Sequence, residues 1–141
     1  AMAPSCPHRQ RQAYRVQHPI LSPTRESTVT FYLISFPSGE MQLDEGGIEQ
    51  AGIDSRQVIR DAKAAGVYVF GGGIDEGVPP VRVAADGTVE EGTYPQTAHL
   101  EGGYTVLRLP DRAAAEEWAA RIAKACRCRQ ELREFMFDPE S

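Results

Sequence analysis

The sequence predicts an α+β fold in which two helices cover one face of an antiparallel sheet. Two segments with apolar residues at helical spacing alternate with short runs of β-branched and aromatic residues. The order is strand–helix–strand, then a hairpin signal, then a second strand–helix–strand unit. Two such units joined by right-handed crossovers form a ferredoxin-like βαββαβ sandwich, here with an inserted β-hairpin.

The first unit begins with a strand at Thr28–Phe36, where β-branched and aromatic residues run up to a Pro-Ser-Gly turn. A glycine- and acid-rich loop is predicted over residues 40–53. Asp54 or Ser55 then caps a helix in which apolar residues recur at helical spacing as far as Gly66. Glycine commonly ends helices because it adopts the left-handed conformation without strain.

The second strand is the apolar run Val67–Phe70, and Asp86-Gly87 later gives a strong signal for a tight hairpin turn. Asp111 caps the second helix, whose apolar stripe ends at Cys126. The strands that complete the prediction cover residues 81–85 and 88–91 in the hairpin, Tyr104–Leu109 in the core, and Leu132–Phe137 at the end.

Both faces of the predicted sheet carry large apolar side chains. Such side chains alternate onto both faces along Thr28–Phe36, and in the second strand Tyr68 and Phe70 oppose Val67 and Val69. Because the helices cover one face, the other needs cover of its own. We therefore expect a homodimer whose two sheets face each other and enclose a cavity in each subunit.

The composition is that of a soluble globular protein, since 41% of the 141 residues are hydrophobic and 25% are charged. The net charge is −5; residues 1–27 carry four arginines against one glutamate, or +3, which leaves −8 on residues 28–141. An acidic body argues against nucleic acid as the main partner, because phosphate binding requires a clustered basic surface.

Residues 1–27 are predicted to form an extended arm, and residues 28–141 the folded domain. The arm holds four of the ten prolines and no sustained periodicity, and Ala1-Met2 has the pattern of a cloning remnant. We expect the arm to pack on its own body or across to the partner. The sequence shows neither a secretory signal nor an apolar run of the roughly 20 residues that span a membrane, so a cytoplasmic location and no membrane partner are expected.

Neither the cysteines nor the glycine run predicts a metal or a cofactor. Cys6, Cys126 and Cys128 are odd in number and lack the two-residue gap of a zinc knuckle, so we expect buried, inert thiols at the helix end. Gly71-Gly72-Gly73 precedes no helix start and lacks the Lys-Ser/Thr of a P-loop. Close backbone packing, or an open rim to the cavity, is the expected role of this run.

Several stretches form a joint pattern: Ala64–Gly73, Glu91–Tyr94, Glu101–Tyr104 and Asp111–Phe135. Together they resemble the YCII-related (DGPF-type) family over roughly residues 28–137. The resemblance implies a dimeric ferredoxin-like α+β barrel. Members of that family include small-lactone dehalogenases and proteins without a settled activity, some of them encoded beside sigma factors.

The chain also departs from the family pattern. The usual Asp-Gly-Pro-Phe is replaced by Glu91-Gly92-Thr93-Tyr94. The resemblance implies a histidine early in the first helix and an aspartate just after the second strand. Ser55 occupies the position of that histidine, whereas Asp75 falls near that of the aspartate. The implied acid–base pair is thus half absent.

His99 is the candidate that replaces the missing histidine, because it lies in the loop entering the strand at Tyr104, beside the predicted cavity. An imidazole exchanges protons near pH 7, and Asp75 or Glu101 would orient it. The alternative is an ordinary surface histidine. Tyr94 completes the predicted catalytic set of His99, Asp75 and Tyr94.

The strand at Tyr104–Leu109 supplies the second group of candidates. Tyr104 and Arg108 share one face, opposite Leu107 and Leu109, so Arg108 should point into the cavity or the dimer seam. There it needs a carboxylate from an acidic ligand or from an interface salt bridge. The predicted ligand-binding residues are Tyr104, Arg108, Tyr68, Phe70 and Glu101.

Two functions remain open on the sequence. The first is a cofactor-free enzyme of the lyase, isomerase or cyclase type, which uses proton transfer on a small molecule in the cavity. The second is a non-catalytic ligand-binding or accessory dimer. The enzyme needs an ionisable group with access to the cavity, whereas the binding protein needs only an apolar pocket.

Overall fold

A computed structural model describes residues 29–141, so the predicted arm lies outside the described part of the chain. The described elements follow the predicted order of strand, helix, strand, hairpin, strand, helix and strand. They are β1 (Thr30–Phe36), α2 (Gly47–Ala64), β2 (Tyr68–Gly73), β3 (Val81–Val83), β4 (Val89–Glu91), β5 (Gly103–Leu109), α3 (Arg112–Cys126) and β6 (Glu131–Glu134), with short 3₁₀ turns at Ser38–Glu40 and Pro95–Thr97.

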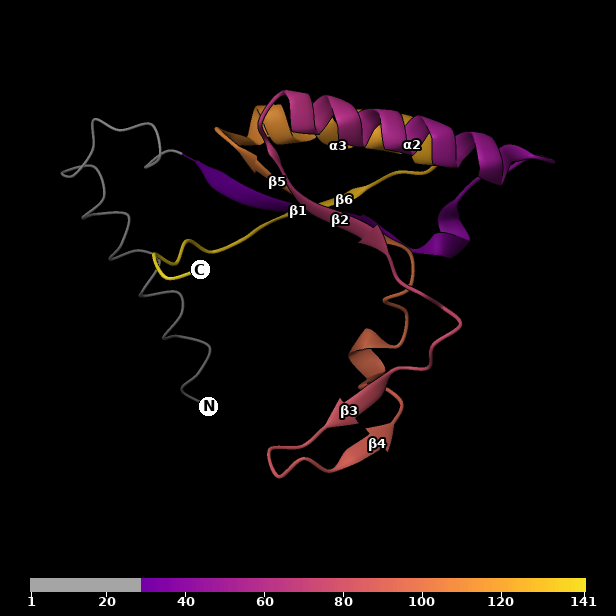
Figure 1. The fold of residues 1–141 in the computed structure, drawn as a ribbon, viewed down its shortest axis with the longest axis vertical. Coiled ribbons are helices and arrows are strands. Elements are labelled where there is room, and N and C mark those ends of the chain that lie inside the picture. Colours follow the sequence, from indigo (N-terminus) through magenta and orange to yellow (C-terminus); the bar gives the residue numbers. More distant parts are fainter. Residues whose placement is uncertain (1–28) are drawn as a thin grey trace.

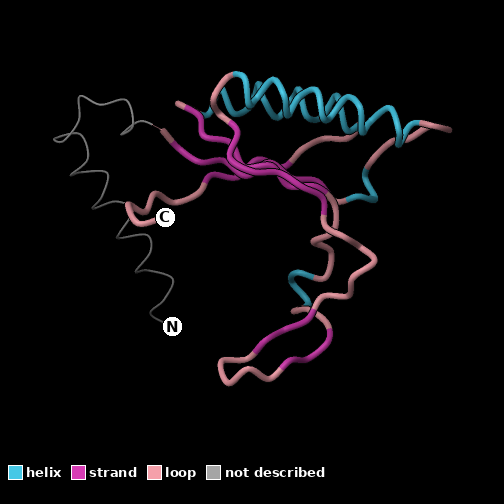
Figure 2. Tube along the Cα trace, in the orientation of Figure 1, coloured by secondary structure: helices cyan, strands magenta, loops and turns pink. Residues whose placement is uncertain are grey.

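Four strands form an antiparallel sheet in the order β2-β5-β1-β6, and both helices cover the same face of it (Figure 1, Figure 2). This arrangement confirms the predicted α+β class and the βαββαβ order, and it is consistent with a ferredoxin-like sandwich. The β3–β4 hairpin pairs separately and projects from the side of the sheet that the helices leave uncovered (Figure 1).

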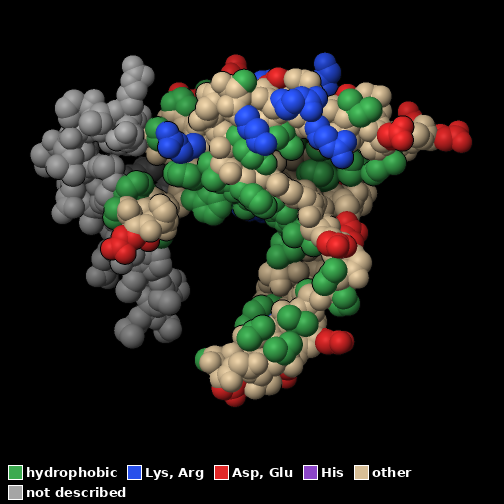
Figure 3. Space-filling model, in the orientation of Figure 1, with side chains coloured by type: hydrophobic (Ala, Val, Ile, Leu, Met, Phe, Trp, Pro, Cys, Tyr) green, Lys and Arg blue, Asp and Glu red, His purple; other side chains and the backbone are tan. Residues whose placement is uncertain are grey.

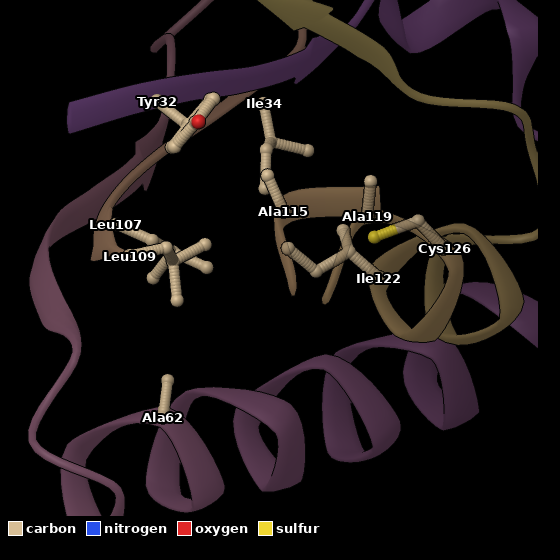
Figure 4. Close-up of a cluster of buried hydrophobic side chains, with 9 residues drawn as sticks. All are labelled: Tyr32, Ile34, Ala62, Leu107, Leu109, Ala115, Ala119, Ile122 and Cys126. Carbon is tan, nitrogen blue, oxygen red and sulfur yellow. The ribbon is translucent and has the colours of Figure 1, made fainter. Parts of the chain in front are cut away.

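The core lies between the helices and the two central strands, β1 and β5. Leu107 and Leu109 are each 1% exposed, and Arg108 between them is exposed on the other face, as the alternation predicts. Figure 4 shows how side chains from both layers point toward one another. The buried core cluster consists of Tyr32, Ile34, Ala62, Leu107, Leu109, Ala115, Ala119, Ile122 and Cys126.

Helix α2 begins at Gly47, so the predicted start at Asp54 or Ser55 and the predicted loop over residues 40–53 are wrong at this end. Gly46 precedes the helix with φ of 76° and supplies no side-chain cap. Glycines and acidic residues weaken the local helix signal here. The burial of Ala51 against the rest of the fold stabilises the additional turns.

Strand β2 extends through the glycine run to Gly73, which is longer than the prediction of Val67–Phe70. A bulge between Tyr68 and Phe70 shifts the register against β5. Phe70 is therefore paired with Val106 on the uncovered face, while Tyr68 packs against the core. The prediction that these two aromatic residues share a face is wrong, because a bulge breaks the two-residue period.

Helix α3 begins as predicted, because the Asp111 carboxylate accepts a hydrogen bond of 2.8 Å from the Ala114 N–H. Two ion pairs join α2 to α3: Arg121 contacts Asp61, and Arg127 Nη1 lies 2.8 Å from Asp54 Oδ2. Strand β6 ends at Glu134, three residues before the predicted end at Phe137.

The hairpin turns at Gly87, whose φ of 92° suits glycine, and it confirms the predicted turn. Its three valines, Val81, Val83 and Val89, are all at least half exposed. Figure 3 shows hydrophobic side chains along this hairpin and beneath the sheet. Among the helices of residues 29–141, none combines the length and the apolar character needed to cross a bilayer.

Candidate functional site

A cavity of about 390 Å³ lies between the sheet and the two helices. The predicted cavity between two facing sheets would lie on the other side of the sheet, so the structure places this pocket within a single chain. Its wall is largely apolar and includes Phe36, Met41, Val58, Ile59, Trp118 and Ile122.

The glycine run provides the space on the sheet side of this cavity. Gly71, Gly72 and Gly73 all line it. A Cβ atom on Gly71 would lie 3.0 Å from the Tyr68 hydroxyl and 3.3 Å from the Tyr104 carbonyl oxygen. Larger residues here would therefore reduce the cavity and press on its aromatic wall.

Few polar groups reach the cavity wall. Ser55 lines it, and its hydroxyl donates a 3.1 Å hydrogen bond to the Gly52 carbonyl. Ser55 is the position at which the family resemblance implies a histidine, so that position does face the pocket. Glu76 is the carboxylate residue among the lining residues, which include no lysine, arginine or histidine in the described part of the chain.

His99 does not line the cavity. Its side chain is 88% exposed, and Nδ1 lies 3.5 Å from Glu101 Oε2. Of the two predicted orienting carboxylates, the structure thus places Glu101 beside it and not Asp75. The loop that carries His99 and Glu101 continues into Gly102, which does line the cavity.

The other two predicted catalytic residues also lie outside the cavity wall. The Asp75 carboxylate accepts a 3.0 Å hydrogen bond from the Gly77 N–H, and so orders the turn after β2. Tyr94 is 64% exposed at the start of a 3₁₀ turn. The structure therefore does not bring His99, Asp75 and Tyr94 together around the cavity.

The predicted ligand-binding residues divide between the two faces of the sheet. Tyr68 packs against the core and borders the cavity from the helix-covered face. Tyr104 is also a lining residue, although its position in β5 puts it on the same face as Val106 and Arg108. The Tyr104 hydroxyl donates a 2.6 Å hydrogen bond to the Leu100 carbonyl, and burial, followed by the charge of Glu101, raises its pKa. Phe70 and Arg108 lie on the uncovered face, and Arg108 is exposed in the single chain, so its place in a dimer seam stays a prediction.

Cys126 lines the cavity, and burial raises the pKa of its thiol to about 11. A thiol with that pKa is protonated at neutral pH and is a weak nucleophile, as predicted for the helix end. Cys128 is partly buried, and Cys6 lies outside the described residues. Within residues 29–141, no three histidine, cysteine or acidic side chains converge on one point.

Sequence reasoning missed Glu76 and Trp118 as cavity residues. Trp118 was assigned to the apolar stripe of the second helix, which is correct, but it also borders the empty space. The guanidinium of Arg121 stacks on the Trp118 ring, with its Cζ 4.4 Å from the ring centre. Glu76 directly follows Asp75, the predicted catalytic aspartate, and no local signal in an irregular loop indicates which of two adjacent acidic residues borders the cavity.

A comparison with protein-family models finds no match for this chain, and a comparison with curated protein sequences finds no significant similarity. The resemblance to the YCII-related family accordingly stays a prediction, and the functional argument depends on the geometry of the site.

Proposed function

We propose that this protein binds a small, largely apolar molecule in the cavity between its sheet and its helices. The observation that carries the proposal is a cavity of about 390 Å³ whose wall is mostly aliphatic and aromatic. Small-molecule sites are usually concave, mostly apolar and supplied with a few polar groups that set orientation. Here Ser55 and Glu76 are available for that role.

Binding can be followed directly, because Trp118 lines the cavity and is the single tryptophan of the chain. Phenylbutanol, an uncharged probe with an aromatic body, should change Trp118 fluorescence in a saturable way. Val58→Phe should weaken this binding by at least about tenfold, because the added ring occupies the cavity. Calorimetric titration provides an independent measure of the affinity.

The matched control is Ile53→Phe, which changes an exposed residue of the same helix that does not line the cavity. It should retain the parent affinity, and melting temperatures should show that both variants are folded. Equal probe binding by the parent and Val58→Phe would locate the site elsewhere and remove the basis of the proposal.

We also propose that the chain is a distant member of the YCII-related family and assembles as a homodimer through its uncovered sheet face. Phe31 and Phe70 on that face are 38% and 66% exposed, and the β3–β4 hairpin projects on the same side (Figure 1). A two-stranded hairpin is marginally stable alone, so a partner surface would stabilise it. The exposed Arg108 would gain a carboxylate partner at such a seam.

A second candidate function is acid–base catalysis on the bound molecule, of the lyase, isomerase or cyclase type and without a cofactor. The observation that favours this function is the contact between His99 Nδ1 and Glu101. His99 lies three residues before Gly102, which lines the cavity. A carboxylate that holds an imidazole in one orientation is a common element of proton-transfer sites.

For this second candidate, His99→Ala should lower turnover of a converted ligand by about 10²–10⁴, as expected for loss of a general acid or base. The melting temperature should not change, since the side chain is 88% exposed. His99→Gln is the variant closest in shape. Turnover that both variants retain would reduce His99 to a surface residue and favour binding without catalysis.

A further inference from the structure

Three of the chain segments that border the cavity carry acidic residues and no lysine or arginine, whereas the bordering parts of α2 and α3 also carry basic residues. Residues 38–55, 71–81 and 92–107 each contribute to the cavity wall. Together they contain eight acidic residues and no lysine or arginine. The acidic residues are Glu40, Asp44, Glu45, Glu49, Asp54, Asp75, Glu76 and Glu101.

The basic residues near the cavity lie in α2 and α3 or directly after α3. Two of them, Arg121 and Arg127, are paired with acidic residues. The backbone carbonyl of Arg127 accepts a hydrogen bond from the Gln42 N–H, and its guanidinium pairs with Asp54. Arg121 pairs with Asp61 while it stacks on Trp118. Lys63 lies 5.2 Å from the Tyr68 ring centre, but it does not line the cavity.

The cavity wall includes one acidic residue, Glu76, and several aromatic residues. An apolar cavity with an acidic residue as the charged member of its wall would attract a cation and repel an anion. Aromatic rings add to this preference, because the negative faces of their π-systems attract cations. A carboxylate or phosphate on the ligand would find no basic side chain on the described cavity wall.

We propose that the ligand of this cavity carries a positive charge, as a protonated amine on an apolar or aromatic body, and that Glu76 pairs with the ammonium group. The inference rests on the proposed function, since it assigns a ligand class to the same cavity. The cavity supplies the surface that binds the apolar body, and the charge of the acidic residue selects among the ligands that fit this cavity.

The test uses three probes that share one body and differ in charge: phenylbutylamine, phenylbutanol and phenylbutyrate. At low ionic strength and pH 7, the full chain should bind the amine about three- to tenfold more tightly than the alcohol, and the carboxylate most weakly. Added salt should narrow these differences, because it screens charges at an open site. Trp118 fluorescence and calorimetry measure all three affinities.

Glu76→Gln should bring the affinity for the amine to within about twofold of that for the alcohol, because it removes the paired charge while keeping the shape. The alcohol itself should bind as it does to the parent. Glu116→Gln is the control, since Glu116 pairs with Arg112 on α3 and does not line the cavity; it should keep the full preference for the amine.

The outcomes separate the inference from the proposal on which it rests. If the alcohol binds and the amine binds no more tightly, or if the carboxylate binds best, the charge assignment is overturned and binding in the cavity stands. If Glu76→Gln keeps the full preference, Glu76 is not the partner of the ammonium. If none of the three probes gives a saturable signal, the proposed function fails first.

Discussion

Gly102→Ala should destabilise the protein by about 3 kcal/mol or more, because overpacking and an unsuitable backbone conformation act together. Gly102 has φ of 121°, a region that residues with a side chain rarely adopt. Its Cβ would overlap the Phe36 carbonyl oxygen and lie 2.8 Å from the Ser38 nitrogen and 2.9 Å from Pro37 Cα. These are backbone atoms at the end of a central strand, so they cannot move aside without loss of strand pairing.

The measurement is urea unfolding at fixed protein concentration, with Gly39→Ala as the control. Gly39 lies in the 3₁₀ turn just after β1, and a Cβ there would meet nothing within 4 Å. Gly39→Ala should change the free energy of unfolding by no more than about 0.5 kcal/mol. Equal stability of the two variants would mean that the start of β5 does not pack against the end of β1 as described.

Phe70→Glu should abolish the proposed homodimer at micromolar concentration. Phe70 is 66% exposed on the uncovered sheet face, opposite Val106. If a second copy covers that face, a carboxylate placed on it would be desolvated without a partner, at a cost of about several kcal/mol. Light scattering coupled to size-exclusion chromatography should give a dimer for the parent and a monomer for the variant.

Ile53→Glu is the matched control, because Ile53 is 50% exposed on α2, in the helix layer across the sheet from Phe70. It adds the same charge on the opposite layer and should remain dimeric. A monomeric parent protein would contradict the dimer outright. A dimer that persists in Phe70→Glu would place the contact on another surface, such as the hairpin.

Much of the fold follows from local signals in the sequence. The alternation along Tyr104–Leu109 assigned Leu107 and Leu109 to the core, because neighbouring residues of a strand point to opposite faces. Asp111 marked the start of α3, since a capping carboxylate acts on a backbone N–H three residues away. These interactions involve residues close in the chain, so their pattern is visible without the structure.

The candidate site was much less predictable. A bulge within β2 sends Tyr68 toward the helices and Phe70 to the uncovered face. The exposed position of His99, and the placement of Glu76 at the cavity in preference to Asp75, depend on how irregular loops pack. Loops lack a fixed period, so spacing does not determine which side chain points inward.

The sequence by itself determined the order of the elements, the two-layer architecture, the faces of the central strands, and the acidic character of residues 28–141. The tertiary structure decided where the empty space lies and which side chains line it. The physical reason is that a cavity is the volume left between segments distant in sequence, here between α2, α3 and the glycine run of β2. Its position depends on the packing of all of them together.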